Sequence, residues 1–281
     1  MPGVCILTDN TVQFPIPAFA GRNRIHVISL SVEMGGEAYD DRLRAADLPV
    51  SKRHGVPPVA IPPSASDFES KYISLSKRYD EVVTILHSNQ LSQTYDHALV
   101  AAEVCQGNMK ITVIDGQTTA TGLGLIVQHA CAAAEEGMDS TQIENMIRSL
   151  LPRMYSVFFS EGLTYFQREG FLGEPQALIA EYLRILPMFI LDNGILLPAQ
   201  KARNYRHMVD LMYEFICEFL ELEHIALIQG VPPFENETRA LRERLALDYP
   251  DAPISEHTIS APLAAMIGPR SLGMFVLQKE E

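Results

Sequence analysis

The fold is decided by residues 82–95, which read VVTILHSNQLSQTY. The apolar run Val82 to Leu86 has the length and β-branched content of a buried strand, and Tyr95 to Cys105 has a helical pattern. The turn between them carries hydroxyls, amides and one imidazole. Such turns lie at the carboxyl edge of parallel sheets, where helix N-termini attract polar and anionic ligands. This stretch therefore predicts a parallel α/β sheet with a binding edge at the turn.

The same arrangement occurs twice more along the chain. Thr8 to Thr11 follows the apolar run Val4 to Leu7, and Asp115 to Gly122 follows Ile111 to Ile114. Three hydroxyl-rich turns at equivalent ends of three strands are expected to converge on one crevice. The alternative for Ser92 is a capping role alone, in which its hydroxyl accepts a backbone N–H of the following helix.

Strands and helices alternate up to residue 150, which predicts an N-terminal three-layer α/β/α domain with a mostly parallel sheet, residues 1–153. Ser140 is expected to cap the last helix of this series. The predicted strands of this domain are Val4–Leu7, Ile25–Val32, Glu81–Leu86 and Lys110–Ile114. The other predicted helices are residues 66–77, 92–105 and 119–136.

The pattern changes after residue 153, and residues 154–281 are predicted to form a C-terminal α/β domain with a mixed sheet. A tight hairpin is expected at Asp192-Asn193-Gly194, because Asn-Gly readily adopts the positive φ angles that such turns need. The predicted strands are residues 155–160, 188–197 as the hairpin, 224–229, 254–258 and 272–277, and the predicted helices are residues 176–186, 204–221 and 234–248.

Composition narrows the class of protein. The chain has 281 residues, 47% of them hydrophobic and 20% charged, as expected of a globular protein. Its net charge of −13 disfavours nucleic acid as a partner. No apolar stretch has the length of an integral membrane segment, and Met1-Pro2-Gly3 does not resemble a signal peptide, so we expect a cytoplasmic protein. The four cysteines have no metal-ligand or disulfide spacing and are expected to be buried reduced thiols.

The common catalytic motifs are absent from the sequence. Gly122-Leu123-Gly124 lacks the third glycine of a dinucleotide fingerprint, and there is no Walker motif or nucleophile elbow. Acidic residues at strand ends, such as Asp9 and Asp115, more often cap backbone groups or face solvent than bind a metal. We therefore expect no metal and no cofactor, and the sequence favours a binding protein over a catalyst.

The chain resembles the DegV family over nearly its whole length. Each matching segment is weak alone, but their order and spacing are specific. The segments are Thr8-Asp9-Asn10-Thr11, Glu37-Ala38-Tyr39-Asp40-Asp41, Pro63-Ser64 with Phe68, Leu91-Ser92-Gln93-Thr94-Tyr95, Ile114-Asp115 with Gly122-Leu123-Gly124, Leu163-Thr164-Tyr165, Asp192-Asn193-Gly194 with Lys201 and Arg203, and Gly268-Pro269 with Leu272-Gly273.

The resemblance implies a bacterial two-domain protein that binds one fatty acid in an interdomain tunnel without catalysis, and that in some members presents the lipid to a fatty-acid kinase. It implies that hydroxyl side chains hold the lipid carboxylate, which needs several donors once it leaves water. The residues of this chain expected to bind lipid are Ser64, Ser88, Asn89, Ser92, Gln93, Thr94, Ile61 and Met266.

The chain departs from the family pattern at the expected head-group site. Ala60-Ile61 replaces a Thr-Ser pair, Met266 stands where members usually have a histidine, and the family's Gly-Gly-Arg is Glu169-Gly170-Phe171 here. Each lost donor to a charged group removes about 1.5–3 kcal/mol, or roughly ten- to a hundredfold in affinity. Either other groups replace these donors or the ligand differs from a free fatty acid.

Lys201 and Arg203 are expected, by the same resemblance, to form part of a surface for a kinase subunit or a phosphate. The alternative is an ordinary solvated pair at the end of a sheet. For the whole chain, the alternatives to a lipid carrier are a small-molecule enzyme, a binder of a different amphiphile in the same cleft, and an interaction scaffold.

Overall fold

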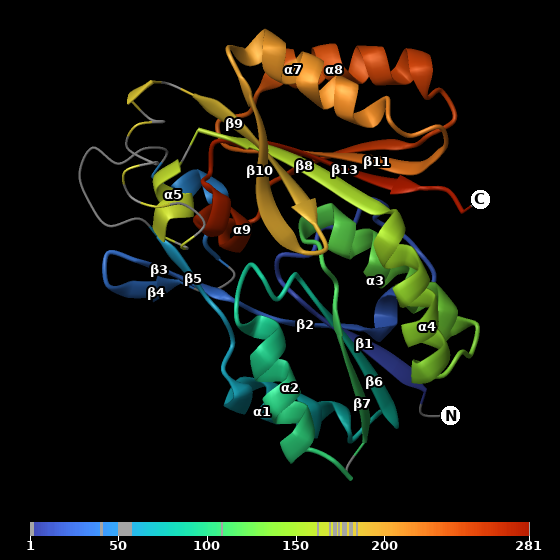
Figure 1. The fold of residues 1–281 in the computed structure, drawn as a ribbon. Helices are drawn as coiled ribbons and strands as arrows, with labels where there is room; N and C mark the ends of the chain where they lie inside the picture. The colour runs from blue at the N-terminus through green and yellow to red at the C-terminus, as the bar shows by residue number, and fades with distance from the viewer. Residues whose placement is uncertain are drawn as a thin grey trace. The chain divides into compact units, whose positions relative to one another are not determined.

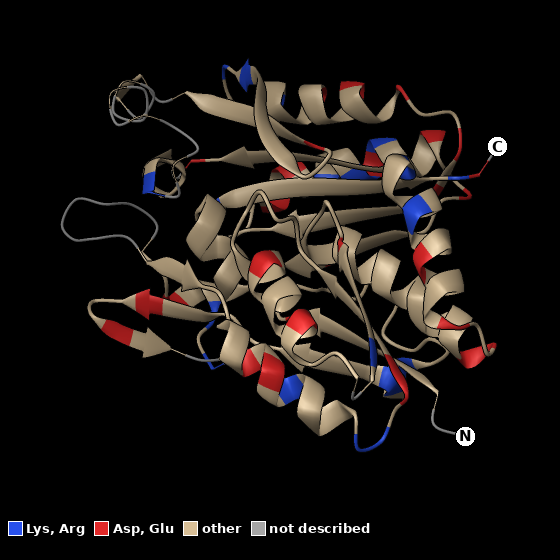
Figure 2. Cartoon of the chain, turned by 60° about the horizontal axis from the view of Figure 1, so that its bottom comes forward, with Lys and Arg blue, Asp and Glu red and all other residues tan. Residues whose placement is uncertain are grey.

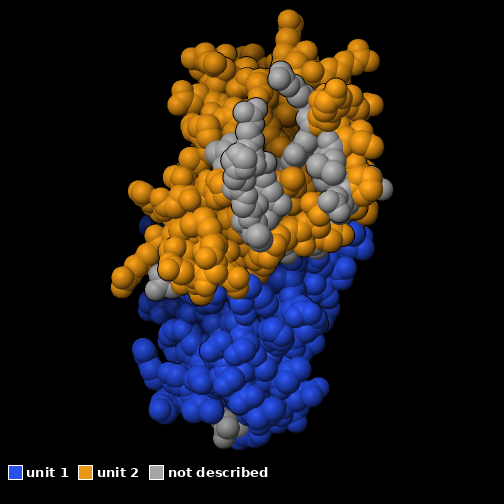
Figure 3. Space-filling model, turned by 90° about the vertical axis from the view of Figure 1, so that its left-hand side faces the viewer, with its two compact units in different colours: residues 1–31, 61–152, 193–195 blue, residues 32–60, 153–192, 196–281 orange. Residues whose placement is uncertain are grey.

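The computed structural model describes residues 3–39, 42–49, 58–107, 109–161, 163–168, 170, 173, 175, 179, 182–183 and 185–280. The chain forms two compact units, which Figure 3 distinguishes by colour. Unit 1 comprises Met1–Ser31, Ile61–Pro152 and Asn193–Ile195, and unit 2 comprises Val32–Ala60, Arg153–Asp192 and Leu196–Glu281. Residues 32–60 thus group with unit 2, although the sequence pattern had assigned them to the N-terminal domain.

Unit 1 contains a four-stranded sheet in the order β2-β1-β6-β7, and the pairs β1–β2, β1–β6 and β6–β7 are all parallel. This confirms the predicted parallel sheet. All six residues of β1 are buried, as expected of a strand covered on both faces. The strands are β1 (Val4–Asp9), β2 (Ile25–Ile28), β6 (Glu81–Leu86) and β7 (Lys110–Asp115).

Helices cover both faces of this sheet (Figure 1). On one face, α1 (Ala65–Leu75) and α2 (Thr94–Val104) bury Phe68, Tyr72 and Ala98 against apolar strand residues. On the other face lie α3 (Ala120–Glu135) and α4 (Ser140–Leu150). The N-cap of α4 is Asp139, whose side chain accepts from the Gln142 N–H, so the prediction of Ser140 as the cap is wrong by one residue.

Unit 2 contains a mixed six-stranded sheet in the order β10-β9-β8-β13-β11-β12, in which β11 and β12 run parallel and β8–β9, β8–β13 and β11–β13 run antiparallel. The predicted hairpin is confirmed, because Asn193 and Gly194 have φ angles of 47° and 81° between β9 and β10. The strands are β8 (Met154–Ser160), β9 (Leu186–Asp192), β10 (Ile195–Ala202), β11 (Leu222–Gln229), β12 (Ile254–Thr258) and β13 (Ser271–Gln278).

Helices α7 (Tyr205–Ile216) and α8 (Glu235–Asp248) pack on this sheet, and their apolar sides join its core through Met208, Met212 and Leu241. Helix α7 ends five residues before the predicted boundary, because residues 217–221 lead into β11. Two helices that the sequence did not predict, α5 (Leu163–Arg168) and α9 (Ala261–Ile267), contact each other. Most of the helix predicted over 176–186 lies outside the described residues.

The predicted strand Ile25–Val32 is two strands in the structure. Strand β2 ends at Ile28, and β3 (Ser31–Met34) starts a separate three-stranded sheet with β4 (Glu37–Tyr39) and β5 (Val59–Ile61), in the order β4-β3-β5. Short helical turns lie at Arg22–Arg24, Ala45–Asp47 and Leu151–Arg153.

Three of the four cysteines are buried, but Cys217 at the end of α7 is exposed, which contradicts the prediction that all four are buried. Burial raises the pKa of the Cys5 and Cys131 thiols to about 12. Among the described residues, no helix combines the length and the apolar character needed to cross a membrane. Nor does that part of the chain contain three or more His, Cys, Asp or Glu side chains grouped as a metal site.

Candidate functional site

The three hydroxyl-rich turns of unit 1 converge, because β1, β6 and β7 are neighbours in one parallel sheet. The backbone N–H of His87 donates to Asp9 Oδ2 at 2.8 Å, which joins the first turn to the second. The N–H of Ser88 donates to the Thr118 carbonyl at 2.8 Å, which joins the second turn to the third. These bonds create one polar cluster at the carboxyl edge of the sheet.

Asp9 is the anionic centre of the cluster and is fully buried. Its Oδ1 accepts from the Thr11 backbone N–H at 2.9 Å and from the Thr11 hydroxyl at 2.6 Å. Burial alone would raise the pKa of Asp9, but the charge of His87 and the hydrogen bonds from His87 and Thr11 outweigh burial and hold the pKa below its ordinary value. Asp9 is therefore ionised at neutral pH.

His87 lies between Asp9 and the serine that the sequence singled out. Its Nδ1 is 2.9 Å from Asp9 Oδ2, a close charge contact although not a well-aligned hydrogen bond, and its Nε2 is 2.7 Å from Ser92 Oγ. The Ser92 hydroxyl is in turn 2.7 Å from the Thr94 hydroxyl. The imidazole is fully buried, whereas Ser92 is half-buried. A continuous polar relay thus runs from Asp9 through His87 to Ser92 and Thr94.

Four further threonines, in the first and third turns, have buried hydroxyls. None of these hydroxyls forms a hydrogen bond with any part of the chain that the structure describes. A buried hydroxyl without a partner costs about 1–3 kcal/mol, so the cluster favours a polar ligand group or water beside them. The four residues are Thr8, Thr118, Thr119 and Thr121.

The third turn is held in an unusual backbone conformation. Gln117 and Ala120 have φ angles of 51° and 48°, a region that residues other than glycine rarely adopt and that is often found at functional sites. Asp115 anchors this turn by accepting from the N–H groups of Gln117 at 3.0 Å and Asn89 at 3.2 Å. Burial raises the pKa of Asp115, and these N–H donors only partly oppose that effect.

Gly124 fixes the loop after β1 against the start of α3. A Cβ at position 124 would lie 1.9 Å from the Gln13 carbonyl oxygen, so no side chain fits there without moving the backbone. The Gln13 N–H also donates to the Ala120 carbonyl at 3.1 Å. Gly124 thus allows a close approach between two turns of the cluster.

The structure brings five of the predicted lipid-binding residues together in the turn before α2. Ser92 and Thr94 belong to the relay, and Gln93 is the exposed N-cap residue of the helix, without a side-chain cap bond. Ser88 is buried, and its hydroxyl donates to the Gly194 carbonyl at 2.7 Å. The Asn89 side chain accepts from the Gln90 amide at 2.8 Å.

The other predicted residues of unit 1 lie on the segment that leads into α1. Ser64 caps α1 through a reciprocal pair of bonds with Asp67, and Ile61 ends β5 with 37% of its surface exposed. The carbonyl of Pro63 lies 2.7 Å from His97 Nδ1 of α2. This contact holds the segment before Ser64 against the helix that follows the Ser92 turn.

Three predicted residues belong to unit 2. Met266 is fully buried on α9. Lys201 and Arg203 are exposed around the end of β10, just before α7, and the Arg203 N–H donates to His207 Nδ1 at 3.2 Å. Figure 2 shows how lysines and arginines are distributed along the ribbon.

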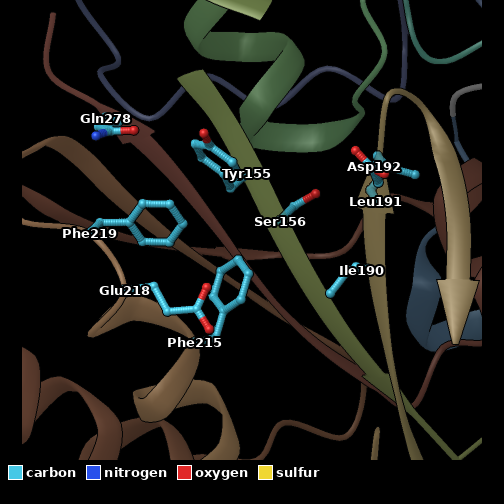
Figure 4. A pocket seen from close by; sticks show the side chains of 9 residues that line it. All are labelled: Tyr155, Ser156, Ile190, Leu191, Asp192, Phe215, Glu218, Phe219 and Gln278. Atoms are coloured by element: carbon cyan, nitrogen blue, oxygen red, sulfur yellow. The ribbon is translucent and has the colours of Figure 1, made fainter. Parts of the chain in front are cut away.

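A pocket of about 430 Å³ lies in unit 2 between β8, β9 and the end of α7 (Figure 4). Its walls combine aromatic rings with polar and acidic groups, and none of the predicted site residues lines it. The lining residues are Tyr155, Ser156, Ile190, Leu191, Asp192, Phe215, Glu218, Phe219 and Gln278.

The residues predicted to bind lipid did not include Asp9, Thr11 and His87, which organise the relay, although all three lie in the hydroxyl-rich turns that the sequence predicts to converge. Asp9 and His87 are 78 residues apart in sequence, and their contact requires β1 and β6 to be neighbours. The signal available in the sequence was their equivalent position, since each lies at the carboxyl end of an apolar strand.

Comparison with known proteins gives a consistent result over the whole chain. The family model described as "Uncharacterised protein, DegV family" matches residues 4–279. A DegV domain-containing protein of Clostridium perfringens is 26% identical, covering 96% of this chain and 97% of the relative. A Thermus thermophilus DegV family protein, described by its fatty acid binding, is 24% identical with a TM-score of 0.82, covering 99% of this chain and 100% of the other.

A second solved structure, the Streptococcus pneumoniae fatty acid kinase B3 protein loaded with linoleic acid, is 17% identical with a TM-score of 0.82. It covers 99% of this chain and 100% of the other. These two likenesses establish the fold, and the family model covers nearly every residue of the sequence. The chain belongs to the DegV family.

Proposed function

We propose that this protein binds a fatty acid, or a lipid closely related to one, without catalysing its conversion. The observation that carries the proposal is the full-length match to the DegV family, because solved proteins of the same fold are described as fatty acid binding. The polar cluster of unit 1 supports it, since a carboxylate that leaves water needs several hydrogen-bond donors.

We place the head group at Ser92 and Thr94, beside the N-terminus of α2, whose first backbone N–H groups and positive dipole end favour an anion. Ser64, Ser88, Asn89 and Gln93 are proposed as further polar contacts. Ile61 and Met266 are proposed as apolar contacts of the acyl chain, because an isoleucine and a methionine offer no strong donor to a carboxylate.

We propose a fatty-acid kinase subunit as a protein partner. Support comes from the Streptococcus pneumoniae relative, which is described as part of a fatty acid kinase. Lys201 and Arg203 are the proposed contact residues, since both are exposed cations on a chain whose net charge is −13. A partner surface that accepts these two cations should be acidic.

Native mass spectrometry of the protein purified from bacteria, followed by lipid extraction, tests the proposal. We expect one fatty acid per chain, and we expect the double variant Ser92→Ala with Thr94→Val to lose it. The matched control is Ser149→Ala, which removes an exposed serine hydroxyl of unit 1 that donates to the Met146 carbonyl of its own helix. Recovery of a different amphiphile, or of no lipid, would contradict the assignment.

The alternative is an acyl-group hydrolase. One observation favours it: Asp9 contacts His87 and His87 contacts Ser92, which is the sequence of contacts in the Asp–His–Ser triad of serine hydrolases. Against it, the His87 ring is fully buried, so it cannot hand a proton directly to a leaving group. A fluorophosphonate probe separates the two functions, because a nucleophilic Ser92 reacts covalently and a hydrogen-bonding Ser92 does not.

A further inference from the structure

The contacts that run from Asp9 to Thr94 determine whether the Ser92 and Thr94 hydroxyls can donate a hydrogen bond to a ligand. The Asp9 carboxylate faces Nδ1 of His87, so the neutral ring keeps its proton on Nδ1 and presents a lone pair at Nε2. That lone pair lies 2.7 Å from Ser92 Oγ, and only the Ser92 proton can satisfy it. With a neutral His87, the Ser92 hydroxyl therefore donates inward.

Every hydrogen-bonding position of the Ser92 hydroxyl is then occupied. Its oxygen has one proton and two lone pairs. The proton goes to His87, while the lone pairs accept from the Thr94 backbone N–H at 3.3 Å and from the Thr94 hydroxyl at 2.7 Å. Both hydroxyl protons point into the protein, so neither hydroxyl can donate to a carboxylate.

One proton added to His87 reverses the direction of these hydrogen bonds. When Nε2 of His87 carries a proton, the ring donates to Ser92 Oγ, and the Ser92 proton is released. It then either contacts a ligand directly or is donated to Thr94 Oγ1, whose own proton becomes available. Protonation of a buried ring thus converts the Ser92–Thr94 pair from a closed pair into a donor.

Charge acts in the same direction. With a neutral ring the buried pair of Asp9 and His87 has a net charge of −1 and repels an anion, whereas with an imidazolium the pair is neutral. Asp115 on β7 is a further carboxyl that interacts with His87: burial raises the pKa of Asp115, His87 partly opposes that rise, and Asp96 of α2 adds to it. An anionic ligand arriving among these carboxylates is therefore best accommodated when a proton arrives with it.

We propose that a carboxylate head group bound at Ser92 and Thr94 is accompanied by the uptake of one proton, which is held on Nε2 of His87. This inference rests on the proposed fatty acid function and assigns His87 as a positioning residue, which acts on the ligand through Ser92.

Isothermal titration calorimetry with laurate, in two buffers of different ionisation enthalpy, measures the proton count directly. Where the free ring is neutral we expect up to one proton taken up per laurate, and an affinity that falls by up to about tenfold for each pH unit, as linkage requires for one proton. Dodecanol has the same chain without a charge and should bind with a pH-independent affinity.

The variant His87→Gln cannot supply the second ring proton, so its laurate binding should be weak and show no proton uptake. His26→Gln is the matched control, because His26 belongs to β2 of the same unit and contacts Tyr79 rather than the relay. If His87→Gln does not fold, nitrogen chemical shifts of the His87 ring in the wild type decide. Nδ1 alone should be protonated in the free protein where the ring is neutral, and both nitrogens should be protonated once laurate is bound.

The outcomes separate this inference from the function on which it rests. Laurate binding with no proton uptake between pH 6 and 9 would overturn the role of His87 and leave fatty acid binding intact. Absence of laurate binding throughout that range would overturn both. Equal proton counts in the wild type and in His87→Gln would also overturn it, because the proton would then be held elsewhere.

Discussion

Two buried histidines in different units each contact a serine hydroxyl, yet their surroundings are opposite. In unit 1, Nε2 of His87 lies 2.7 Å from Ser92, and Asp9 faces the other ring nitrogen. In unit 2, Nε2 of His224 lies 2.9 Å from Ser255, and two ionisable groups act on the pKa of His224: His257, which lowers it, and Glu223, which raises it by less.

The comparison shows that burial alone does not fix the charge of a histidine. Burial, reinforced by His257, lowers the pKa of His224 to about 4, so that ring is neutral at physiological pH. At His87 a buried carboxylate is present to compensate a second ring proton. The same His–Ser pair thus lies beside a second histidine in unit 2 and beside a buried carboxylate in unit 1.

The largest expected effect comes from removing the carboxylate that distinguishes the two histidines. Asp9→Asn should lower the free energy of unfolding by about 3–5 kcal/mol at pH 7, because it removes a buried carboxylate and leaves the buried donors around it unmatched. Urea denaturation measures the change. The control is Asp210→Asn, whose pair with Arg244 is about 40% exposed and should be worth less than about 1 kcal/mol. Equal losses in the two variants would mean that Asp9 and His87 act as an ordinary surface pair.

The second prediction concerns the neutral histidine. Unfolded His224 binds a proton below pH 6.5, whereas the folded protein does so only near pH 4, so the unfolded state binds more protons in this interval. The unfolding free energy should therefore fall as the pH drops from 6.5 to 4, by up to about 3 kcal/mol at about 1.4 kcal/mol per pH unit. His224→Gln should lose correspondingly less than the wild type in urea titrations at pH 7 and pH 4.5. The same loss in both proteins would refute a neutral His224.

The third prediction concerns a variant that keeps the Asp9 carboxylate but removes one hydrogen-bond donor to it. Thr11→Val deletes the hydroxyl that donates to Asp9 at 2.6 Å and should cost about 2 kcal/mol at pH 7, the usual range for a hydrogen bond to a charged group. Since the pKa of Asp9 is lowered in the folded protein, its contribution is present above the pKa of an unfolded aspartate and is lost as the pH falls through the folded value. The difference between variant and wild type should therefore shrink below about pH 4, and a pH-independent difference would show that Thr11 does not act through the Asp9 charge.

The smallest expected effect tests the serine of the neutral pair. Ser255→Ala should reduce the unfolding free energy by about 1 kcal/mol, as for one uncharged hydrogen bond, and should leave laurate affinity unchanged. Ser92→Ala, by contrast, should reduce the affinity roughly ten- to a hundredfold. If both serine variants bound laurate as the wild type does, Ser92 would have no special role and the head group would lie elsewhere.

The sequence predicted the regular elements of both sheets well, because buried strands have a local signal. Glu81–Leu86 and Ile254–Thr258 were predicted to the residue. The three-residue strands β4 and β5 were missed, since so few residues show no periodicity. Helix α9 was missed for a different reason: all seven of its residues are buried, so it has no polar face and no helical period.

Only the part of the candidate site that is contiguous in the sequence was predicted. The hydroxyl-rich turn at Ser92 is contiguous in the chain, so its composition could be recognised directly. The contact between Asp9 and His87 depends on strand order, and strand order is set by tertiary packing over 78 residues of sequence. Alternation of strands and helices predicts a parallel sheet but does not say which strands are neighbours.

Gly124 has a consequence for how this protein tolerates change. Because a side chain there would collide with the Gln13 carbonyl, the constraint at position 124 is purely steric and independent of any ligand. Positions 87, 92 and 94, in contrast, are constrained by hydrogen-bond chemistry, which a new head group would alter. In a library of variants selected to bind a different lipid, substitutions should therefore accumulate around the relay, whereas position 124 should remain glycine. Gly124 is thus a requirement of the fold and not of ligand specificity.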